Sequence, residues 1–145
     1  MMTIYPACFY KEKNGYTVIF PDLNGLATCG NTLTETMDMA IDCMAGYVYD
    51  EQEEGHPLPD ASELNEIDPL EYGKKQLPDL EFQECFVNYV SVDVNDYARR
   101  HFEKTVKKTL TIPAWLNRQA IRYGINCSKV LKKALIAELK EIRNN

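Results

Sequence analysis

The segment Thr105–Pro113, TVKKTLTIP, constrains the fold of this 145-residue chain more than any other. Read as a strand, it places Val106, Leu110 and Ile112 on one face and Lys107, Thr109 and Thr111 on the other. A single strand leaves its backbone N–H and C=O groups unpaired, and about forty residues are too few to bury a core. We therefore predict that residues 105–145 fold as a dimer, in which two strands pair antiparallel and four helices close over their apolar face.

Two helical patterns follow the strand. The first, Ala114–Tyr123, has apolar residues at helical spacing, and Gly124 marks its end. Asn126 is well placed to cap the second helix. The apolar stripe of that second helix consists of Leu131, Ala134, Leu135, Leu139 and Ile142.

This arrangement resembles the ribbon-helix-helix family of DNA-binding domains, on the strand 107–112, the turn 124–128 and the helix 130–135. The resemblance implies a two-stranded ribbon in the major groove of DNA. The base-facing residues of each strand would be Lys107, Thr109 and Thr111. A phosphate would be held at the start of the second helix by Asn126, Cys127, Ser128 and Lys129. An ordinary strand that feeds a helical hairpin is the alternative.

Charge divides the chain into two parts. Residues 105–145 carry nine Lys or Arg and two Asp or Glu, a net charge of +7. Residues 1–104 carry seven and twenty, a net charge of −13, so the whole chain has −6. The basic part suits a polyanion, whereas the acidic part would be repelled by nucleic acid and suits a basic protein.

Composition indicates a globular protein, since 45% of the residues are hydrophobic. We expect no signal peptide and no membrane span. The five cysteines are scattered and odd in number, which is typical of reduced thiols in or near the core of a cytoplasmic protein. Cys127 would be an exception, because it lies at a helix N-terminus, where the pKa of a thiol is lowered.

The acidic part begins with three predicted strands, at 3–10, 16–20 and 26–30. Asn14-Gly15 predicts a tight turn between the first two, and Pro6 suggests an edge or a bulge in the first. Thr32 and Glu35 form a capping box that opens a helix. Its predicted apolar face is Leu33, Met37, Ala40, Ile41, Met44 and Val48.

Residues 60–81 are acidic, rich in proline and without periodicity, so we predict a mobile loop there. Residues 84–94 carry apolar side chains on both parities and predict a strand that is covered on both faces. A short helix should follow, capped by Asp93 or Asn95. The predicted domains are therefore 1–98 and 105–145, joined by a linker at 99–104.

The first ninety-odd residues are similar to the HicB antitoxin family, in motifs taken in chain order. These are Tyr5-Pro6-Ala7, Gly15-Tyr16, Phe20-Pro21-Asp22-Leu23 with Gly25, Thr28-Cys29-Gly30 with Thr32-Leu33, and Gly55 with Pro57-Leu58-Pro59. One departure is Asn24, where the family usually has proline. The resemblance implies an α+β fold, in which a βββαβ domain similar to a truncated ribonuclease H precedes the DNA-binding module. It also implies a type II antitoxin that blocks HicA, a ribonuclease that cuts messenger RNA, and represses its own operon.

An enzyme of ribonuclease H type is not favoured by the residues. Such nucleases hold two metal ions on clustered carboxylates, one usually from the first strand, and residues 3–10 contain no Asp or Glu. Asp38 and Asp42 lie away from the apolar stripe, as on a solvated face. The two histidines, His56 and His101, lack a metal-ligand spacing. We therefore expect no catalytic residues, no metal and no cofactor.

Two functions remain open. The chain is either an antitoxin that neutralises a ribonuclease and represses transcription, or a stand-alone DNA-binding regulator whose first domain senses a ligand or mediates assembly. The acidic domain favours the antitoxin, because an RNA-binding toxin must present a basic surface. The expected toxin contact includes Phe20, Pro21, Asp22 and Leu23. The expected partners are thus a HicA-like toxin, operator DNA and a second copy, with further association of dimers left open.

Overall fold

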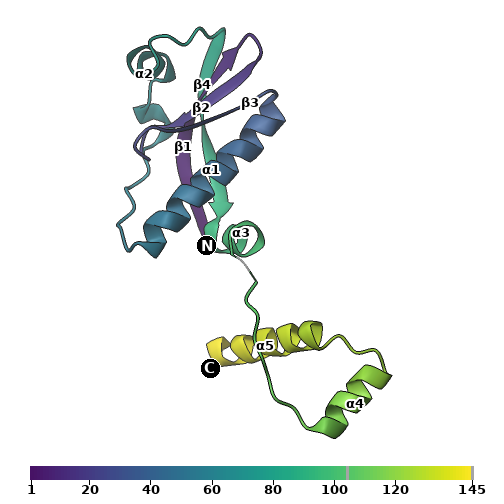
Figure 1. The fold of residues 1–145 in the computed structure, drawn as a ribbon. Helices are drawn as coiled ribbons and strands as arrows, with labels where there is room; N and C mark the ends of the chain where they lie inside the picture. The colour runs from purple at the N-terminus through teal and green to yellow at the C-terminus, as the bar shows by residue number, and fades with distance from the viewer. Residues whose placement is uncertain (104, 145) are drawn as a thin grey trace. The chain divides into compact units, whose positions relative to one another are not determined.

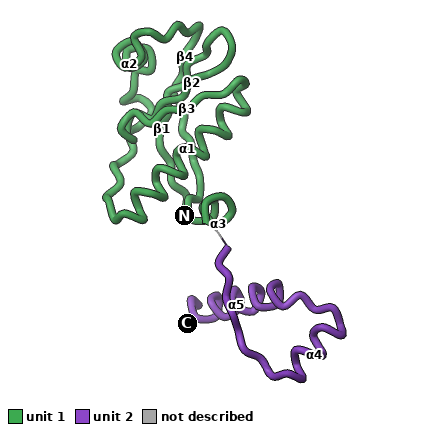
Figure 2. Tube along the Cα trace, viewed as in Figure 1, with its two compact units in different colours: residues 1–104 green, residues 105–145 purple. Residues whose placement is uncertain are grey.

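The computed structural model describes residues 1–103 and 105–144. Its contacts divide the chain into two compact units, residues 1–104 and 105–145, called unit 1 and unit 2 below (Figure 2). The predicted linker includes Lys104 and the predicted second domain includes Asn145, and both residues lie outside the described part of the chain.

Unit 1 is built on a four-stranded sheet (Figure 1). Its strands are β1 (Met2–Glu12), β2 (Gly15–Phe20), β3 (Leu26–Gly30) and β4 (Glu84–Asp93). The strand order is β3-β2-β1-β4, and every pairing is antiparallel. The predicted α+β class and all four predicted strands are confirmed within one or two residues at their ends.

The β1–β2 hairpin forms where the Asn14-Gly15 signal predicts it. Glu12 pairs with Gly15, so the loop contains two residues, Lys13 and Asn14. Gly15 has φ +152°, and a Cβ atom there would lie 2.4 Å from the carbonyl oxygen of Gly30 on β3. A side chain at this position would therefore force the first turn and the third strand apart.

The suggestion that Pro6 marks an edge strand is wrong for β1 as a whole, because β1 pairs with both β2 and β4. The pairing with β2 begins only at Cys8, however, so at Pro6 the strand has its neighbour on the β4 side alone. Proline is tolerated at such a position because the missing N–H leaves no gap in the β1–β2 ladder.

Helix α1 (Leu33–Glu53) covers one face of the sheet. The Thr32 hydroxyl accepts a hydrogen bond from the Glu35 amide at 3.1 Å, and the Glu35 carboxylate accepts one from the Asn31 amide at 3.2 Å. The carboxylate thus reaches one residue further back than a standard capping box predicts. Leu33, predicted on the apolar face, is 46% exposed, because burial on α1 begins only at Thr36.

Residues 60–81 do not form the mobile loop that we predicted. They contain a 3₁₀ turn, η1 (Leu64–Glu66), and a helix, α2 (Pro69–Gln76), which pack on the second face of the sheet. The buried sheet residues there are Cys8, Tyr10 and Ile19, in contact with Ile67, Tyr72, Leu77, Leu80 and Phe82. Two helix-start signals were present in the sequence, since Asp68 accepts from the Leu70 and Glu71 amides and proline occupies the first helical position.

The prediction that β4 is covered on both faces holds only for the first half of the strand, because Tyr89 and Ser91 on the α2 side are exposed. Phe86 stacks on Phe9 on the α1 side, with ring centroids 4.9 Å apart, whereas Val87 packs with Cys8 on the α2 side. Asp93 caps the next helix, α3 (Val94–His101), by accepting from the Asp96 amide at 3.1 Å. Because α3 continues to His101, a linker cannot begin at Arg99.

Unit 2 contains the two predicted helices, α4 (Ala114–Arg122) and α5 (Cys127–Asn144). Gly124, at φ +64°, ends α4, and the Asn126 side chain caps α5 by accepting from the Lys129 amide at 3.1 Å. The described residues 105 to 113 take neither helix nor strand in the single chain. The ribbon and the dimer therefore stay predictions.

The packing of α2 on Tyr10 can be tested at Gly73. A Cβ atom at Gly73 would lie 2.5 Å from Cε1 of Tyr10, whereas one at Gly46, within α1, would meet nothing closer than 3.8 Å. Gly46→Ala should stabilise unit 1 by about 0.5–1 kcal/mol through helix propensity. Gly73→Ala has the same propensity gain but should destabilise unit 1 by about 1–3 kcal/mol through overpacking.

The measurement is urea unfolding followed by the near-ultraviolet circular dichroism of tyrosine. The single tryptophan, Trp115, lies in unit 2, so its fluorescence reports the other unit separately. Equal stabilisation by the two substitutions would mean that α2 does not pack against Tyr10.

Candidate functional surfaces

The predicted base-facing residues Lys107, Thr109 and Thr111 are exposed in the single chain. The alternate apolar residues are exposed as well, at 92% for Val106, 52% for Leu110 and 43% for Ile112. An isolated chain therefore offers both faces of this segment to water, and nothing in the described part of unit 2 covers the apolar one.

The helices of unit 2 also leave large apolar side chains uncovered. Ala120 is the one buried residue among those described in this unit. Side chains that are at least 41% exposed are Trp115, Leu116, Ile121, Tyr123, Ile125, Val130, Leu135, Ile136, Leu139 and Ile142. Monomeric proteins rarely leave so many large apolar side chains of a short segment exposed, so unit 2 has the composition of an interface.

At the start of α5, the structure changes one detail of the predicted phosphate site. The Lys129 amide donates to the Asn126 side chain and is thus not free to bind a phosphate. Among the described residues, the amides of Cys127 and Ser128 remain at this helix end, together with the exposed Lys129 side chain.

Two of the four side chains in the predicted toxin contact at residues 20–23 are buried in the single chain. Phe20 and Leu23 are 0% and 1% exposed and belong to the core under α1. Pro21 and Asp22 remain half-buried, and the Asp22 carboxylate accepts from the amide and the hydroxyl of Ser62, both at 2.8 Å. This loop therefore anchors the segment that follows α1 rather than standing free.

The second face of the sheet is covered over only part of its length. Cys8 and Tyr10 lie under the α2 segment, but Met2 and Ile4, further back along β1, are 54% and 46% exposed. Tyr89 and Ser91 of β4 lie on the same face and are also exposed. We call these four residues the open sheet surface. Sequence reasoning missed it, although the even-numbered apolar residues at the start of β1 were its signal.

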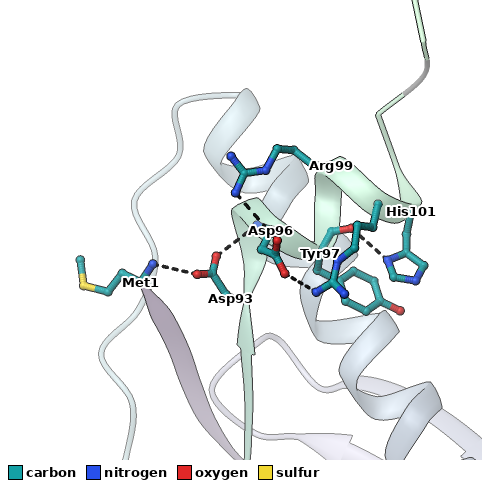
Figure 3. A network of polar contacts seen from close by, with 7 residues as sticks. Met1, Asp93, Asp96, Tyr97, Arg99 and His101 are labelled. Atoms are coloured by element: carbon teal, nitrogen blue, oxygen red, sulfur yellow. Dashed lines mark hydrogen bonds and ion pairs between the residues drawn. The ribbon is translucent and has the colours of Figure 1, made fainter. Parts of the chain in front are cut away.

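A polar network fixes α3 at the end of the sheet (Figure 3). The terminal ammonium of Met1 lies 3.1 Å from the Asp93 carboxylate, and Asp96 pairs with Arg99 and Arg100. The hydrogen bond from the Asp96 amide, helped by the Met1 ammonium, lowers the pKa of Asp93. The network holds a capped helix in place and has no geometry of a catalytic site.

The histidines have the following surroundings. His101 stacks on Tyr97 with ring centroids 3.9 Å apart (Figure 3). The Tyr97 hydroxyl donates to Asp42 at 2.9 Å. His56 lies 3.4 and 3.3 Å from the carboxylates of Glu51 and Glu54. These three ligand atoms lie within 4.8 Å of one another, a proximity that the sequence spacing did not suggest. The three side chains lie together because the chain turns back at the end of α1 through Gly55, which has φ +73°.

The cysteines are all free thiols. Burial raises the pKa of Cys8 to about 11, so its thiol stays protonated and unreactive. The expectation that the cysteines pack in or near the core is wrong for Cys29, which is exposed, and Cys127, set apart in the sequence analysis, is exposed as well. None of the described helices has the length and apolar character that crossing a bilayer requires.

Comparison with known proteins gives relatives over most of the chain. A 14.9 kDa protein from the rep–hol intergenic region of Haemophilus phage HP1 is 31% identical over 113 residues, which are 78% of this chain and 75% of the phage protein. A chain of a toxin–antitoxin complex from Streptococcus pneumoniae is 30% identical and has a TM-score of 0.63, with 95% of this chain and 99% of that chain covered. A chain of the HicA3 and HicB3 toxin–antitoxin complex is 24% identical with a TM-score of 0.46, covering 60% and 94%.

The model of the HicB-like antitoxins of bacterial toxin–antitoxin systems matches residues 5–135. This match spans both units, from β1 to the middle of α5. Together with the sheet, the two-unit division and the similarity to the pneumococcal complex, it shows that the chain belongs to the HicB-like antitoxin family.

Proposed function

We propose that this antitoxin neutralises a HicA-like ribonuclease through unit 1 and represses its own operon through unit 2. The observation that carries the proposal is the opposite charge of the two units, −13 and +7. Opposite charges on separately folded units suit two partners of opposite charge. The similarity to a chain of the pneumococcal toxin–antitoxin complex supports the protein partner.

Unit 1 has the charge that an inhibitor of an RNA-binding enzyme requires. A ribonuclease that binds RNA must present cations to the phosphates, and an acidic domain that occupies them excludes the RNA. Acidic charge also speeds the encounter with a basic partner through long-range attraction. The inhibitor needs no catalytic group of its own.

Unit 2 forms the proposed DNA-binding part as a dimer. The strands 105–113 of two chains pair antiparallel and satisfy the backbone groups that one chain leaves unpaired. Val106, Leu110 and Ile112 then face the helices, and burial of each such side chain contributes about 1.5–3 kcal/mol. Lys107, Thr109 and Thr111 remain on the outer face of the ribbon, which fits the major groove.

A first prediction concerns the dimer. A fragment of residues 105–145 should unfold with a midpoint that rises with protein concentration, because folding and association are then one equilibrium. Thermal melts followed by Trp115 fluorescence over a hundredfold range of concentration are the measurement. A midpoint that stays constant over this range, with the fragment folded, would contradict the dimer.

A second prediction concerns neutralisation. If the adjacent reading frame encodes a short basic protein, the full chain should inhibit RNA cleavage by that protein, and raised salt should slow their association. Stopped-flow mixing at two salt concentrations measures the rate. If the neighbouring frame encodes no such ribonuclease, or the rate is indifferent to salt, the stand-alone regulator is favoured.

A third prediction separates base reading from phosphate binding. Lys107→Ala should cost about 1–3 kcal/mol per half-site on operator DNA, because Lys107 can donate to guanine O6 and N7. Thr109→Ala should cost less and relax the preference at one base per half-site. Lys129→Ala should weaken operator and scrambled DNA alike and make the salt dependence shallower.

Lys108 is the matched control for Lys107, since its side chain shares the parity of Leu110 and lies off the reading face. Fluorescence anisotropy titrations of the four variants on both DNAs provide the data. Loss of operator preference in Lys108→Ala, with Lys107→Ala unchanged, would show that the strand register is shifted by one residue.

A further inference from the structure

The open sheet surface lies where two strands expose one face without a helix over it. The register pairs Ile4 with Ser91 and Pro6 with Tyr89, so Ile4 and Tyr89 are diagonal neighbours on this face. Pro6 is fully buried beside them, whereas Met2 is 54%, Ile4 46% and Tyr89 37% exposed. Apolar side chains thus continue from the core directly onto an accessible surface.

The segment bordering this surface carries a net negative charge, because its five carboxylates outnumber the two lysines that follow in α2, Lys74 and Lys75. Residues 60–71 contain five carboxylates and no Lys or Arg, the five being Asp60, Glu63, Glu66, Asp68 and Glu71. Among the residues that the structure describes, none of the five carboxylates forms an ion pair, although ion pairs occur elsewhere in unit 1. Hydrogen bonds to amides or hydroxyls place several of them but do not neutralise their charge.

The apolar and acidic parts are joined by one contact. The Tyr89 hydroxyl, on β4, donates to the carboxylate of Glu63, the residue that precedes η1, at 3.1 Å. This contact holds a carboxylate at the border of the apolar area. Protein–protein interfaces usually have an apolar centre surrounded by a polar rim.

Resting on the proposed function, we propose that the open sheet surface, with Glu63 and Glu66 at its rim, is where the basic toxin docks. The apolar centre is covered by the toxin and loses its contact with water, while the carboxylates face cations that otherwise bind RNA. A second copy of this chain is disfavoured as the occupant, because self-association would bring two uncompensated acidic rims together.

The test compares two variants in the surface with two matched variants outside it, all in the full chain. Ile4→Arg places a cation in the apolar centre, and Leu33→Arg is its control, since Leu33 is equally exposed at 46% but lies on α1, over the other face. Glu63→Lys reverses a charge at the rim, and Glu53→Lys reverses one at the exposed end of α1. The probe is the basic protein of the adjacent reading frame, titrated by calorimetry.

Ile4→Arg and Glu63→Lys should each weaken binding by about tenfold or more, as loss of a buried contact or a close charge pair does, whereas the controls should stay within about twofold. Glu63→Lys should also reduce the salt dependence of association. Circular dichroism confirms that each variant is folded. Because Glu63 is an exposed residue outside the core, Glu63→Lys still tests the surface if Ile4→Arg unfolds.

Three outcomes would overturn the proposal. Wild-type binding with both surface variants equal to their controls would place the toxin elsewhere and leave the proposed function intact. A decrease in self-association of Ile4→Arg, without any change in toxin binding, would assign the surface to a second copy. Failure of the wild-type chain to bind the probe would remove both the surface and the proposed neutralisation.

Discussion

Unit 1 depends on burying both faces of β1 within a sheet of only four strands. Alternate residues of β1 point to opposite faces, so each face needs its own cover. Helix α1 covers Ala7 and Phe9, and the segment after α1 must then cross to the other side to cover Cys8 and Tyr10. That crossing brings the chain into β4 antiparallel to β1 and leaves the far end of the second face open. The fold and the exposed surface thus have the same physical origin.

The strands, the hairpin and α1 could be predicted from the sequence because local signals and burial agree there. The Asn14-Gly15 signal marks the hairpin and Thr32 starts a helix. The apolar residues on both parities in the first half of β4 reflect two covered faces there. The α2 segment could not, since its apolar contacts with Tyr10 come from far along the chain and follow no helical period. Asp68-Pro69 was a usable start signal, but the acidic and proline-rich composition around it indicated a loop.

The candidate sites also differ in whether local sequence patterns or contacts between distant residues define them. Alternation in residues 107–111 is a local property, so the exposed polar residues of the proposed ribbon followed from the sequence alone. The toxin contact predicted at residues 20–23 was based on a motif, and a motif does not distinguish residues that build the core from residues that contact a partner. Burial makes that distinction at Phe20 and Leu23, and the hydrogen bond between Tyr89 and Glu63 joins strands and loop residues that no sequence spacing relates.

The net charge of −6 describes neither unit. A partner responds to the charges of the unit that it contacts, because interactions between exposed charges are short-ranged in salt solution. At physiological salt the Debye length is about 8 Å, so an exposed charge acts mainly on molecules that approach it closely. The carboxylates of residues 60–71 therefore act on what meets the sheet face beside them, and the cations of unit 2 act on what meets α4, α5 and the segment before them. One chain can in this way attract a basic protein and an anionic polymer. The condition is that each set of charges lies beside apolar side chains or backbone groups that can contact the corresponding partner. The open sheet surface meets this condition in unit 1, and the unpaired segment 105–113 meets it in unit 2.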